Sequence, residues 1–385
     1  MNQNNRRILT GFSRILVTGE NGFIAKNLIT TLKQYDGVTI ITTSRKDNED
    51  IILSKIRNID AVVHLAGENR PEDPSLFFQN NTRLTEILCN MLEAECKRMS
   101  KKIPIIYSSS TQVEIENDYG ASKLMSEKAI EEYAKKTSSA GIIFRLPSVF
   151  GKWSKPNYNS VVATFCHNIA RDLPIEIHEP NKLLQLVYID DVIRSFLDVE
   201  LNDGSFGFRN IDPKYEISLS DLAKQIQDFR NCRTSLLSEP VGTGLIRCLY
   251  STFLSFFPVE RFHYRIPNHS DPRGSFVEIL KTQNAGQFSF FTSKPGVIRG
   301  GHYHHTKSEK FLVVRGSARF RFRNLMTNQL YELDVDDHDP TIVDTIPGWS
   351  HDVVNTGHED LIVFLWANEV FDRDNPDTYQ SKVTL

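Results

Sequence analysis

The sequence lacks any large imbalance of charge. Its 45 Lys and Arg residues nearly match its 48 Asp and Glu residues, so the formal net charge is only -3. A protein that binds nucleic acid through its phosphates needs a strongly basic face, and this composition gives no sign of one. We therefore expect no nucleic-acid partner, and we expect any charged ligand to be bound by local groups.

Long apolar runs are missing as well. No stretch approaches the roughly 18 apolar residues that a membrane-spanning helix needs. Residues 1–12 contain two arginines but no apolar region typical of a secretion signal. The five cysteines are widely spaced and form no CxxC pair, as is typical of reduced thiols in a cytosolic protein. These features predict a cytoplasmic protein with no membrane association.

The length of 385 residues favours two domains over one core. Histidine is unevenly spread, because eight of the 11 histidines lie from His263 onward, whereas all five cysteines precede it. The least patterned stretch runs from about residue 231 to residue 268. We place the boundary near Pro258, which predicts one domain over residues 1–257 and another over residues 258–385.

A dinucleotide fingerprint follows the first expected strand. Residues 14–18 indicate a short buried strand, residues 19–25 read GENGFIA, and a helical pattern continues through Leu32. In this arrangement the first glycine makes a tight turn, the second lets the backbone approach a pyrophosphate, and the following helix N-terminus favours its charge. The third glycine position is Ala25, an accepted substitute. The predicted cofactor-binding residues here are Gly19, Asn21, Gly22, Phe23 and Ile24.

The next expected strand, residues 38–43, ends in Ser44, Arg45 and Lys46, where an NAD-specific site usually has an acidic residue. A basic pair suits a 2′-phosphate, so we predict NADPH with Arg45 as a contact. The alternative is a solvated charge pair beside Asp47. Further strands over residues 60–65 and 103–107 alternate with helical stretches, which predicts a parallel sheet covered on both faces.

Residues 119–123 read YGASK, and Tyr119 and Lys123 lie four apart, on one face of an expected helix. An ammonium close to a phenol favours the phenolate, so the pair can act as a proton donor or acceptor. In the alternative interpretation Tyr119 packs in the core and Lys123 is a solvated charge. The spacing alone does not decide between the two.

The motifs TGENGF, HLAG, SSS and YGASK, in this order and spacing, resemble the extended short-chain dehydrogenases/reductases. The resemblance implies that Ser110 hydrogen-bonds the substrate oxygen, Tyr119 exchanges the proton, and Lys123 holds the ribose. It also implies that the HLAG segment contributes to the cofactor site through Leu65, Ala66 and Gly67. Residues 145–151 and 188–192 resemble segments of the sugar-nucleotide branch, with Ser148 in place of the usual asparagine, and residues 152–160 fall where such enzymes bind the nucleotide sugar.

From His263 onward, short apolar strands separated by Gly, Pro and Asp turns predict an antiparallel barrel or sandwich. In a strand, His302 and His304 project to the same face, and Glu309 could return from the next strand. Together with His351 they form a ligand set that suits zinc or another divalent metal. The alternative is a polar histidine cluster on a surface strand.

The two histidine segments resemble the paired motifs of cupins, with the usual PxG turn contracted to Pro347 and Gly348. Residues 271–276 and 296–303 resemble deoxysugar epimerases instead, which implies that His302 is the base and that Lys310 stabilises the enolate. A histidine bound to a metal has no lone pair left for a base. We favour the metal, which leaves His305 and Tyr303 as candidate bases.

Over nearly its full length the chain resembles the bifunctional capsular polysaccharide synthesis enzymes F, as in residues 150–166, 250–258, 304–316 and 371–379. The resemblance implies an extended short-chain dehydrogenase/reductase domain of the α/β Rossmann type, followed by an all-β cupin (jelly-roll) domain. It implies that the cupin inverts C3 of a UDP-linked 2-acetamido-2,6-dideoxy-4-hexulose and that the first domain reduces C4 with NADPH. The implied product is UDP-N-acetyl-6-deoxytalosamine, and the implied assembly is a homodimer.

Two other functions remain open. The cupin could be a structural or dimerising module that binds a metal, beside an active reductase. The chain could also be a nicotinamide-dependent regulator with a cupin sensor, although a regulator has no need of Ser110, Tyr119 and Lys123 together. Proton exchange at C3 of the sugar distinguishes the first alternative, and the effect of Tyr119→Phe distinguishes the second.

Overall fold

The computed structural model describes residues 12–199, 201, 204–267, 269–271, 274–276, 280–282, 286–369 and 374–384. The chain forms two compact units, one of residues 1–160 and 184–216, the other of residues 161–183 and 217–385. No helix in the described part of the chain is long and apolar enough to cross a membrane. The domain boundary predicted between residues 257 and 258 remains a prediction.

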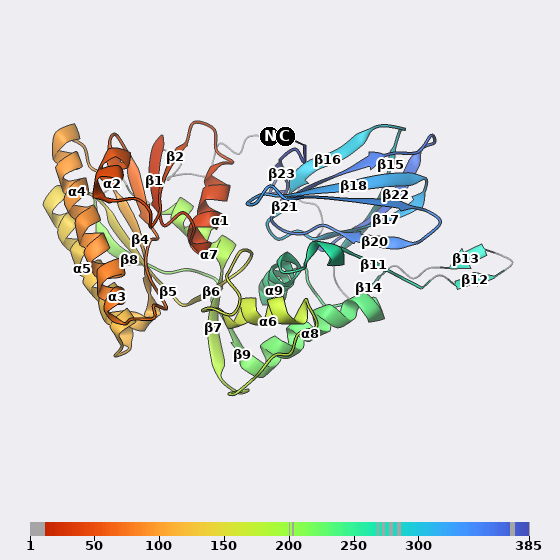
Figure 1. Cartoon of the computed structure of the whole chain (residues 1–385), viewed down its shortest axis with the longest axis horizontal. Coiled ribbons are helices and arrows are strands. Elements are labelled where there is room, and N and C mark those ends of the chain that lie inside the picture. Colours follow the sequence, from red (N-terminus) through yellow and green to blue (C-terminus); the bar gives the residue numbers. More distant parts are fainter. Residues whose placement is uncertain are drawn as a thin grey trace. The chain divides into compact units, whose positions relative to one another are not determined.

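A six-stranded parallel sheet in the order β2-β1-β3-β4-β5-β8 forms the centre of the first unit (Figure 1). Its strands are short and consist largely of buried Ile, Val and Leu, as expected for a sheet covered on both faces. Their bounds are β1 Arg14–Thr18, β2 Thr39–Thr43, β3 Ala61–His64, β4 Ile105–Ser110, β5 Gly141–Leu146 and β8 Phe206–Arg209.

Helices cover both faces of this sheet, with α4 packed on α5 and α1 packed on α7. Beneath α4 and α5 lies a core cluster that includes Leu16, Val62, Leu92 and Tyr107. The bounds are α1 Phe23–Leu32, α2 Glu49–Ile56, α3 Ser75–Phe77, π-helix η2 Phe78–Arg83, α4 Leu84–Met99, 3-10 helix η3 Thr111–Glu114, α5 Asp118–Thr137 and α7 Ile189–Asp198.

The strand order reverses direction at β1, because β1 lies between β2 and β3. In open parallel sheets this switch point, at the carboxyl ends of the strands, is where ligands bind. The loops that follow β1 and β3 therefore line the expected ligand position. A separate three-stranded sheet in the order β6-β7-β9 consists of β6 Ser148–Phe150, β7 Leu183–Tyr188 and β9 Tyr215–Ser218.

The second unit contains three helices that pack together, α6 Val161–Ile169, α8 Leu219–Ser235 and α9 Gly244–Ser255. It also contains two five-stranded antiparallel sheets, in the orders β11-β20-β17-β22-β15 and β19-β18-β21-β16-β23. Buried aromatic side chains fill the β domain, with Phe311 in contact with Phe320, and Phe262 in contact with both Phe322 and Trp349. This is the packing expected of two sheets face to face.

The strands of the two large sheets have these bounds: β11 His263–Arg265, β15 Gln287–Ser293, β16 Ile298–Tyr303, β17 Glu309–Arg315, β18 Ser317–Asn324, β19 Leu330–Asp336, β20 Thr341–Asp344, β21 Trp349–Asn355, β22 Leu361–Ala367 and β23 Tyr379–Gln380. Short strands form two further pairs, β10 Leu237–Ser238 with β14 Lys281–Thr282, and β12 His269–Asp271 with β13 Gly274–Phe276. The remaining helix is the 3-10 helix η4 Val259–Arg261.

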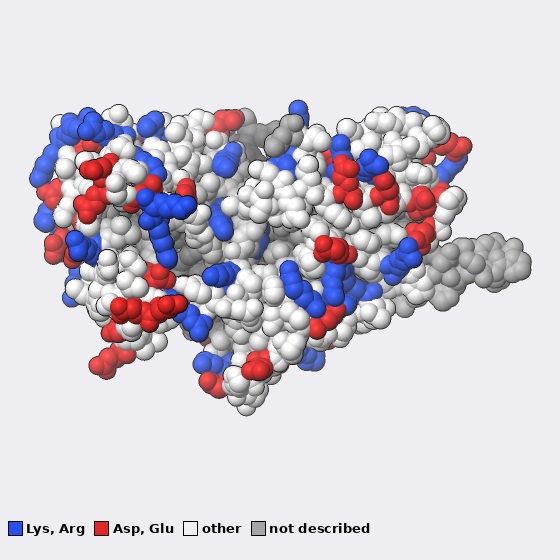
Figure 2. Space-filling view, viewed as in Figure 1, with Lys and Arg blue, Asp and Glu red and all other residues white. Residues whose placement is uncertain are grey.

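The predicted fold class is confirmed, since a Rossmann-like parallel sheet precedes an antiparallel β domain. The strands expected at residues 38–43, 60–65 and 103–107 appear as β2, β3 and β4. Acidic and basic side chains lie side by side over the face shown in Figure 2, in keeping with the nearly balanced composition. Of the segments used for the family resemblance, residues 272, 273 and 371–373 lie outside the described residues.

Candidate active sites

The glycine-rich turn joins β1 to the N-terminus of α1. Gly19 has a φ of +74°, and a Cβ atom there would lie 2.8 Å from the Cα of Ala66. Gly22, the N-cap of α1, offers no side chain to the first turn of the helix. Backbone N–H groups at such a helix end are suited to an anion. The structure thus brings the predicted residues 19–24 and the loop after β3 to one place, in a shape that fits a dinucleotide.

The loop after β3 is fixed by Thr18 at the end of β1. The Thr18 hydroxyl accepts hydrogen bonds from the backbone N–H groups of Leu65 and Ala66, each at 3.0 Å. A Cβ on Gly67 would lie 2.8 Å from Asn81 Oδ1 and 3.2 Å from Lys123 Nζ. Only glycine leaves this space open, so the predicted cofactor residues Ala66, Gly67 and Lys123 do lie together.

Arg45 extends from the end of β2, with a side chain 80% exposed. Its guanidinium forms an ion pair of 2.6 Å with Glu68, whose side chain is only 8% exposed. The same carboxylate accepts a 3.0 Å hydrogen bond from the hydroxyl of Tyr158. Sequence analysis missed Glu68, although it directly follows the HLAG segment. The proposed contact between Arg45 and a 2′-phosphate remains a prediction.

Helix α5 carries the tyrosine and the lysine on its first turns. Asn117 caps the helix by accepting a hydrogen bond of 2.7 Å from the backbone N–H of Gly120. The hydroxyls of Ser110 and Tyr119 are hydrogen-bonded, and Lys123 Nζ donates to the Ser108 carbonyl at 3.0 Å. The structure therefore brings the three predicted residues Ser110, Tyr119 and Lys123 together at the carboxyl end of β4.

Burial changes the acidity of both reactive groups. It raises the pKa of Tyr119, an effect that the hydrogen bond from Ser110 opposes. It lowers the pKa of Lys123 to about 8, although the charge of Glu127 acts in the other direction. The phenol is therefore protonated at neutral pH, while the ammonium lies close enough to its pKa to lose its proton in mildly alkaline solution.

Asn81 supports this site from the π-helix η2, and sequence analysis did not identify it. Its amide donates to the Ser122 hydroxyl at 2.9 Å and to the Glu68 carbonyl at 3.0 Å, and its Oδ1 accepts from the Glu68 N–H at 2.7 Å. Single turns of π-helix often occur at functional sites. Asn81 thus connects the loop after β3 to the helix that carries Tyr119 and Lys123.

The region predicted to bind the nucleotide sugar begins with a structural lysine. Lys152 is 1% exposed and forms an ion pair of 2.7 Å with Asp190. Its carbonyl accepts a hydrogen bond from Asn27. Further along, the carbonyl of Tyr158 accepts a hydrogen bond from Arg70. Ser148, which stands at the position of the usual asparagine, is exposed at the start of β6.

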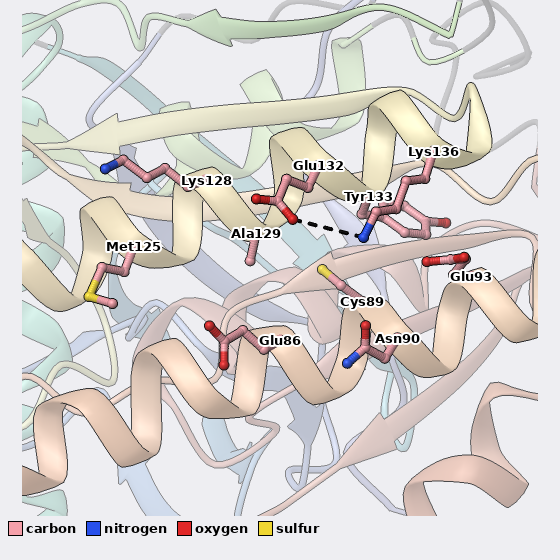
Figure 3. Close-up of a pocket in the computed structure, with 10 residues that line it drawn as sticks. All are labelled: Glu86, Cys89, Asn90, Glu93, Met125, Lys128, Ala129, Glu132, Tyr133 and Lys136. Carbon is pink, nitrogen blue, oxygen red and sulfur yellow. Dashed lines mark ion pairs between the residues drawn. The ribbon is translucent and has the colours of Figure 1, made fainter.

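A groove between α4 and α5 is a different feature and contains none of the predicted site residues (Figure 3). Its walls bear charges of both signs, including an ion pair between Glu132 and Lys136. Burial raises the pKa of the Cys89 thiol in this groove to about 12, so the thiol is not a nucleophile at neutral pH. The groove offers no arrangement for catalysis.

In the β domain, the four predicted metal ligands form one cluster, with ligand atoms all within 4.8 Å of one another. His302 lies near the end of β16, His304 directly follows that strand, Glu309 begins β17, and His351 lies on β21. Glu309 Oε2 is 3.2 Å from His304 Nε2 and 3.6 Å from His351 Nε2. Ligands about 2.1 Å from a tetrahedral zinc ion lie roughly 3.4 Å apart, so the residues fit this metal.

The electrostatics of this cluster favour a cation. Burial, together with the neighbouring histidines, lowers the pKa of His302 to about 3, which keeps its lone pair free of a proton. Burial opposes ionisation of Glu309, but His304 and His351 hold its pKa well below the usual value. Within the described part of the chain, neither ring nitrogen of the buried His351 has a hydrogen-bond partner. A bound metal would satisfy one of these nitrogens.

The structure does not bring Lys310 into this cluster. Successive side chains of a strand point to opposite faces, so Lys310 points away from the face that Glu309 occupies. Its ammonium forms a buried ion pair of 2.7 Å with Asp344, which also binds Arg233 of α8 at 2.5 Å. A hydrogen bond of 3.3 Å to the Tyr264 hydroxyl completes this network.

The two candidate bases lie beside the cluster, against the end of the chain. The Tyr303 ring stacks on Tyr379 with centroids 5.5 Å apart, and His305 contacts the edge of the same ring at 4.9 Å. Tyr303 is buried, whereas His305 is half-buried. Another ammonium, that of Lys307, lies 2.9 Å from Glu309 Oε1. Sequence analysis did not single out Lys307, although it lies within the segment that spans the ligands.

Two family models match different parts of the chain. Residues 15–202 match the NAD dependent epimerase/dehydratase family, and residues 269–379 match the polysaccharide biosynthesis C-terminal domain. The chain is 50% identical over 373 residues to a UDP-2-acetamido-2,6-beta-L-arabino-hexul-4-ose reductase from Pseudomonas aeruginosa, an alignment that covers 96% of this chain and 99% of the relative.

Two further proteins are similar to the chain at lower sequence identity. The crystal structure of the capsular polysaccharide assembling protein CapF from Staphylococcus aureus is 36% identical, with a TM-score of 0.64, covering 96% of this chain and 100% of that one. A dTDP-4-dehydro-6-deoxyglucose reductase from Escherichia coli is 23% identical over 60% of this chain and 86% of its own length. The first two relatives align with both parts of the chain.

Proposed function

The chain belongs to one family with the UDP-2-acetamido-2,6-beta-L-arabino-hexul-4-ose reductase of Pseudomonas aeruginosa and with CapF, and on this premise we propose that it reduces the C4 ketone of a UDP-linked 2-acetamido-2,6-dideoxy-4-hexulose with NADPH. The observation that carries the proposal is the grouping of Ser110, Tyr119 and Lys123 beside Gly67. This grouping combines a proton donor with a cation at the switch point of a parallel sheet, where a nicotinamide cofactor fits.

In the reaction, bound NADPH supplies a hydride to C4. Tyr119 gives its hydroxyl proton to the C4 oxygen, and its raised pKa keeps that proton in place at neutral pH. Ser110 donates a hydrogen bond to the same oxygen. The ammonium of Lys123 stabilises the phenolate that remains on Tyr119, until a proton from solvent restores the phenol.

We further propose that the β domain inverts C3 before this reduction. A ketone at C4 makes the C3 proton acidic, so inversion needs only a base and a group that stabilises the enolate. A zinc ion held by His302, His304, Glu309 and His351 would act as that stabilising Lewis acid. The base is then a different group, and His305 and Tyr303 are the candidates.

The chemistry requires the two steps to occur in this order. Once C4 is an alcohol, the C3 proton is no longer acidic and the configuration is fixed. Inversion followed by reduction leads to UDP-N-acetyl-6-deoxytalosamine, a precursor of UDP-N-acetylfucosamine for a capsule or O-antigen. The position of Lys310, which faces Asp344 rather than the cluster, favours the metal over this lysine as the stabiliser of the enolate.

An alternative function is that of a reductase whose β domain only binds a structural metal or forms a dimer. The cluster offers four protein ligands, and structural zinc sites also use four. The number of ligands is therefore compatible with a structural site as well as with a catalytic one. Exchange of the C3 proton distinguishes the two functions. Only an epimerase exchanges it in the absence of NADPH.

The reduction can be tested with the purified full-length protein, the UDP-linked 4-keto sugar and either NADPH or NADH. We expect NADPH oxidation at 340 nm, and a product with an equatorial or axial hydroxyl at C4 by proton NMR in place of the ketone. Replacing Arg45 by Ala should weaken NADPH binding about tenfold by removing a charged hydrogen bond, with Lys97→Ala, at an exposed lysine of α4, as the control. Failure to oxidise either cofactor would contradict the proposed function.

Some further properties complete the proposal. We propose that the protein is cytoplasmic, where its five cysteines, which are buried and form no disulfide, stay reduced. We also propose a homodimer, with the reductase in residues 1–257 and the cupin in residues 258–385. Light scattering of the full chain tests the dimer, and limited proteolysis near residue 258 tests the division.

A further inference from the structure

Strand β23, near the end of the chain, pairs with β16, the strand that carries the candidate ligand His302. Strand β23 pairs antiparallel with β16, so that Gln380 lies opposite the ligand His302 and Tyr379 lies opposite Tyr303. Next to this pair, the Ser381 N–H donates to the Gly301 carbonyl at 2.8 Å. Residues 379–380 therefore form an additional strand beside the segment that carries two of the four candidate ligands.

Asp377, two residues before β23, binds the loop between His304 and Glu309. Its Oδ1 accepts a hydrogen bond of 2.9 Å from the backbone N–H of His305. Its Oδ2 accepts from the backbone N–H groups of Thr306 and Lys307, both at 2.7 Å, and from the Thr306 hydroxyl at 2.9 Å. One carboxylate thus satisfies three successive backbone donors and fixes the course of the loop.

The main chain of Asp377 also contacts a ligand directly. Its carbonyl oxygen lies 2.5 Å from His304 Nδ1. A carbonyl has no proton to give, so Nδ1 must carry a proton, and in the neutral ring Nε2 then carries the lone pair. That Nε2 is the atom 3.2 Å from Glu309 Oε2. The contact therefore selects the tautomer, and the ring orientation, in which His304 can bind a metal.

We propose that Asp377 is a positioning residue of the metal cluster. Its carboxylate fixes the loop from His304 to Glu309, and this keeps the Asp377 carbonyl against His304, in the tautomer that can bind a metal. It acts through these residues and is not one of the four candidate ligands. The inference depends on metal binding by the cluster and not on epimerase activity, so it goes beyond the proposed reaction. Partners of this kind typically change metal affinity by 10–100-fold when they are lost.

The segment around β23 is also held by contacts that do not involve Asp377. Arg323 of β18 donates to the Lys382 carbonyl at 2.8 Å and to the Ser381 hydroxyl at 3.0 Å. The side chain of Val383 is 2% exposed. A substitution at Asp377 alone leaves these anchors in place, so the strand pairing should persist while the loop loses its carboxylate.

The test compares Asp377→Asn with Asp374→Asn in the full-length protein. Asp374 is exposed in the same segment, so it is a matched control for the loss of one charge. Zinc affinity is measured by competition with a chromophoric chelator. We expect binding by Asp377→Asn to be about 10–100-fold weaker than by the wild-type protein, with Asp374→Asn within about twofold of the wild type.

A second readout separates positioning from a general loss of stability. The melting temperature of each protein is measured with and without saturating zinc, because only a change in metal binding alters the difference between the two values. We expect this difference to shrink for Asp377→Asn. If Asp377→Asn does not fold, Asp377→Glu, which keeps the charge but lengthens the side chain, is measured instead, with the same expectation. Unchanged zinc affinity, or a wild-type protein that binds no zinc, would overturn the inference.

Discussion

In the Rossmann-like unit, the side chains of the candidate site form hydrogen bonds with neighbouring protein groups. In the β domain, four candidate metal ligands face one another. Lys123 donates to the Ser108 carbonyl, and Tyr119 is hydrogen-bonded to Ser110. The cluster in the β domain instead brings three imidazoles and a carboxylate within 4.8 Å. We propose that the first site donates a proton without the help of an ion and that the second site holds a metal ion.

The two sites also differ in what holds them in place. In the first, loops with glycine bring the backbone close, as at Gly19 and Gly67. In the second, the loop and strand that carry the ligands are held by the Asp377 side chain and by pairing with β23, both of which lie far along the chain. We therefore expect the two sites to respond independently to mutation and to metal removal, and the following experiments test this separation.

The largest effect is expected from Tyr119→Phe. Removal of the hydroxyl proton donor should reduce the rate of NADPH oxidation by at least about 100-fold, in the range typical of lost general acid catalysis. Exchange of the C3 proton should be unchanged. Tyr35→Phe, also a half-buried tyrosine of the first unit, is the matched control, and loss of both activities in Tyr119→Phe would argue against separate sites.

The reciprocal experiment is His351→Ala, or treatment of the wild-type protein with a chelator. The remaining ligands should hold zinc too weakly for exchange at C3, while NADPH binding measured by fluorescence should stay as in the wild type. His358→Ala changes a histidine of the same domain that lies outside the cluster and is the control. Weakened NADPH binding in His351→Ala would show that the two sites are coupled.

A smaller effect, on stability, is expected from Lys310→Met. The change leaves the buried Asp344 with Arg233 as its remaining cationic partner, and breaking a buried pair in this way should reduce the free energy of unfolding by about 3 kcal/mol. Urea unfolding measures this quantity, with the exposed Lys294→Met as control. Zinc affinity should not change. Loss of C3 exchange in a Lys310→Met protein of normal stability would instead give Lys310 a direct role.

The smallest predicted effect is a pH dependence of the reductase. Burial lowers the pKa of Lys123 to about 8, so the ammonium loses its proton as the pH rises through that value. The rate of reduction should fall several-fold between pH 7.5 and 9. The free energy of unfolding should change in the opposite direction. The pKa of Lys123 in the folded protein lies below its usual value of 10.5, so unfolding takes up a proton between about pH 8 and 10.5. The folded protein therefore becomes more stable as the pH rises over this range. A flat rate profile over these values would contradict the role of Lys123.

Local spacing made the first site predictable. Tyr119 and Lys123 lie four apart on one helix, and the glycine turn follows directly after a strand, so short segments of sequence contain most of the geometry. Their supports were not predictable in the same way. Asn81 and Glu68 act through contacts with residues distant in sequence, and nothing in their immediate neighbourhood indicates these partners.

The second site shows which contacts of a strand residue its sequence position does not indicate. His302, His304 and Glu309 lie together as expected, although His304 follows the end of β16. The residue after Glu309, Lys310, points to the other face of β17 and contacts Asp344. A resemblance between motifs does not resolve such a one-residue difference, because the alternation of a strand assigns neighbours to opposite faces. Asp377 lies some 70 residues from the loop that it binds, and only the folded chain reveals that contact.

The central claim is that two separate activities act in sequence on one sugar. The most direct measurement is proton NMR of the UDP-linked 4-keto-6-deoxy sugar in heavy water with the purified zinc-loaded protein, without NADPH, following the C3 signal. The account predicts that this signal disappears, in the wild type and in Tyr119→Phe alike. If the signal persists while later addition of NADPH still leads to its oxidation, the protein is a reductase alone, and the claim of epimerisation is wrong.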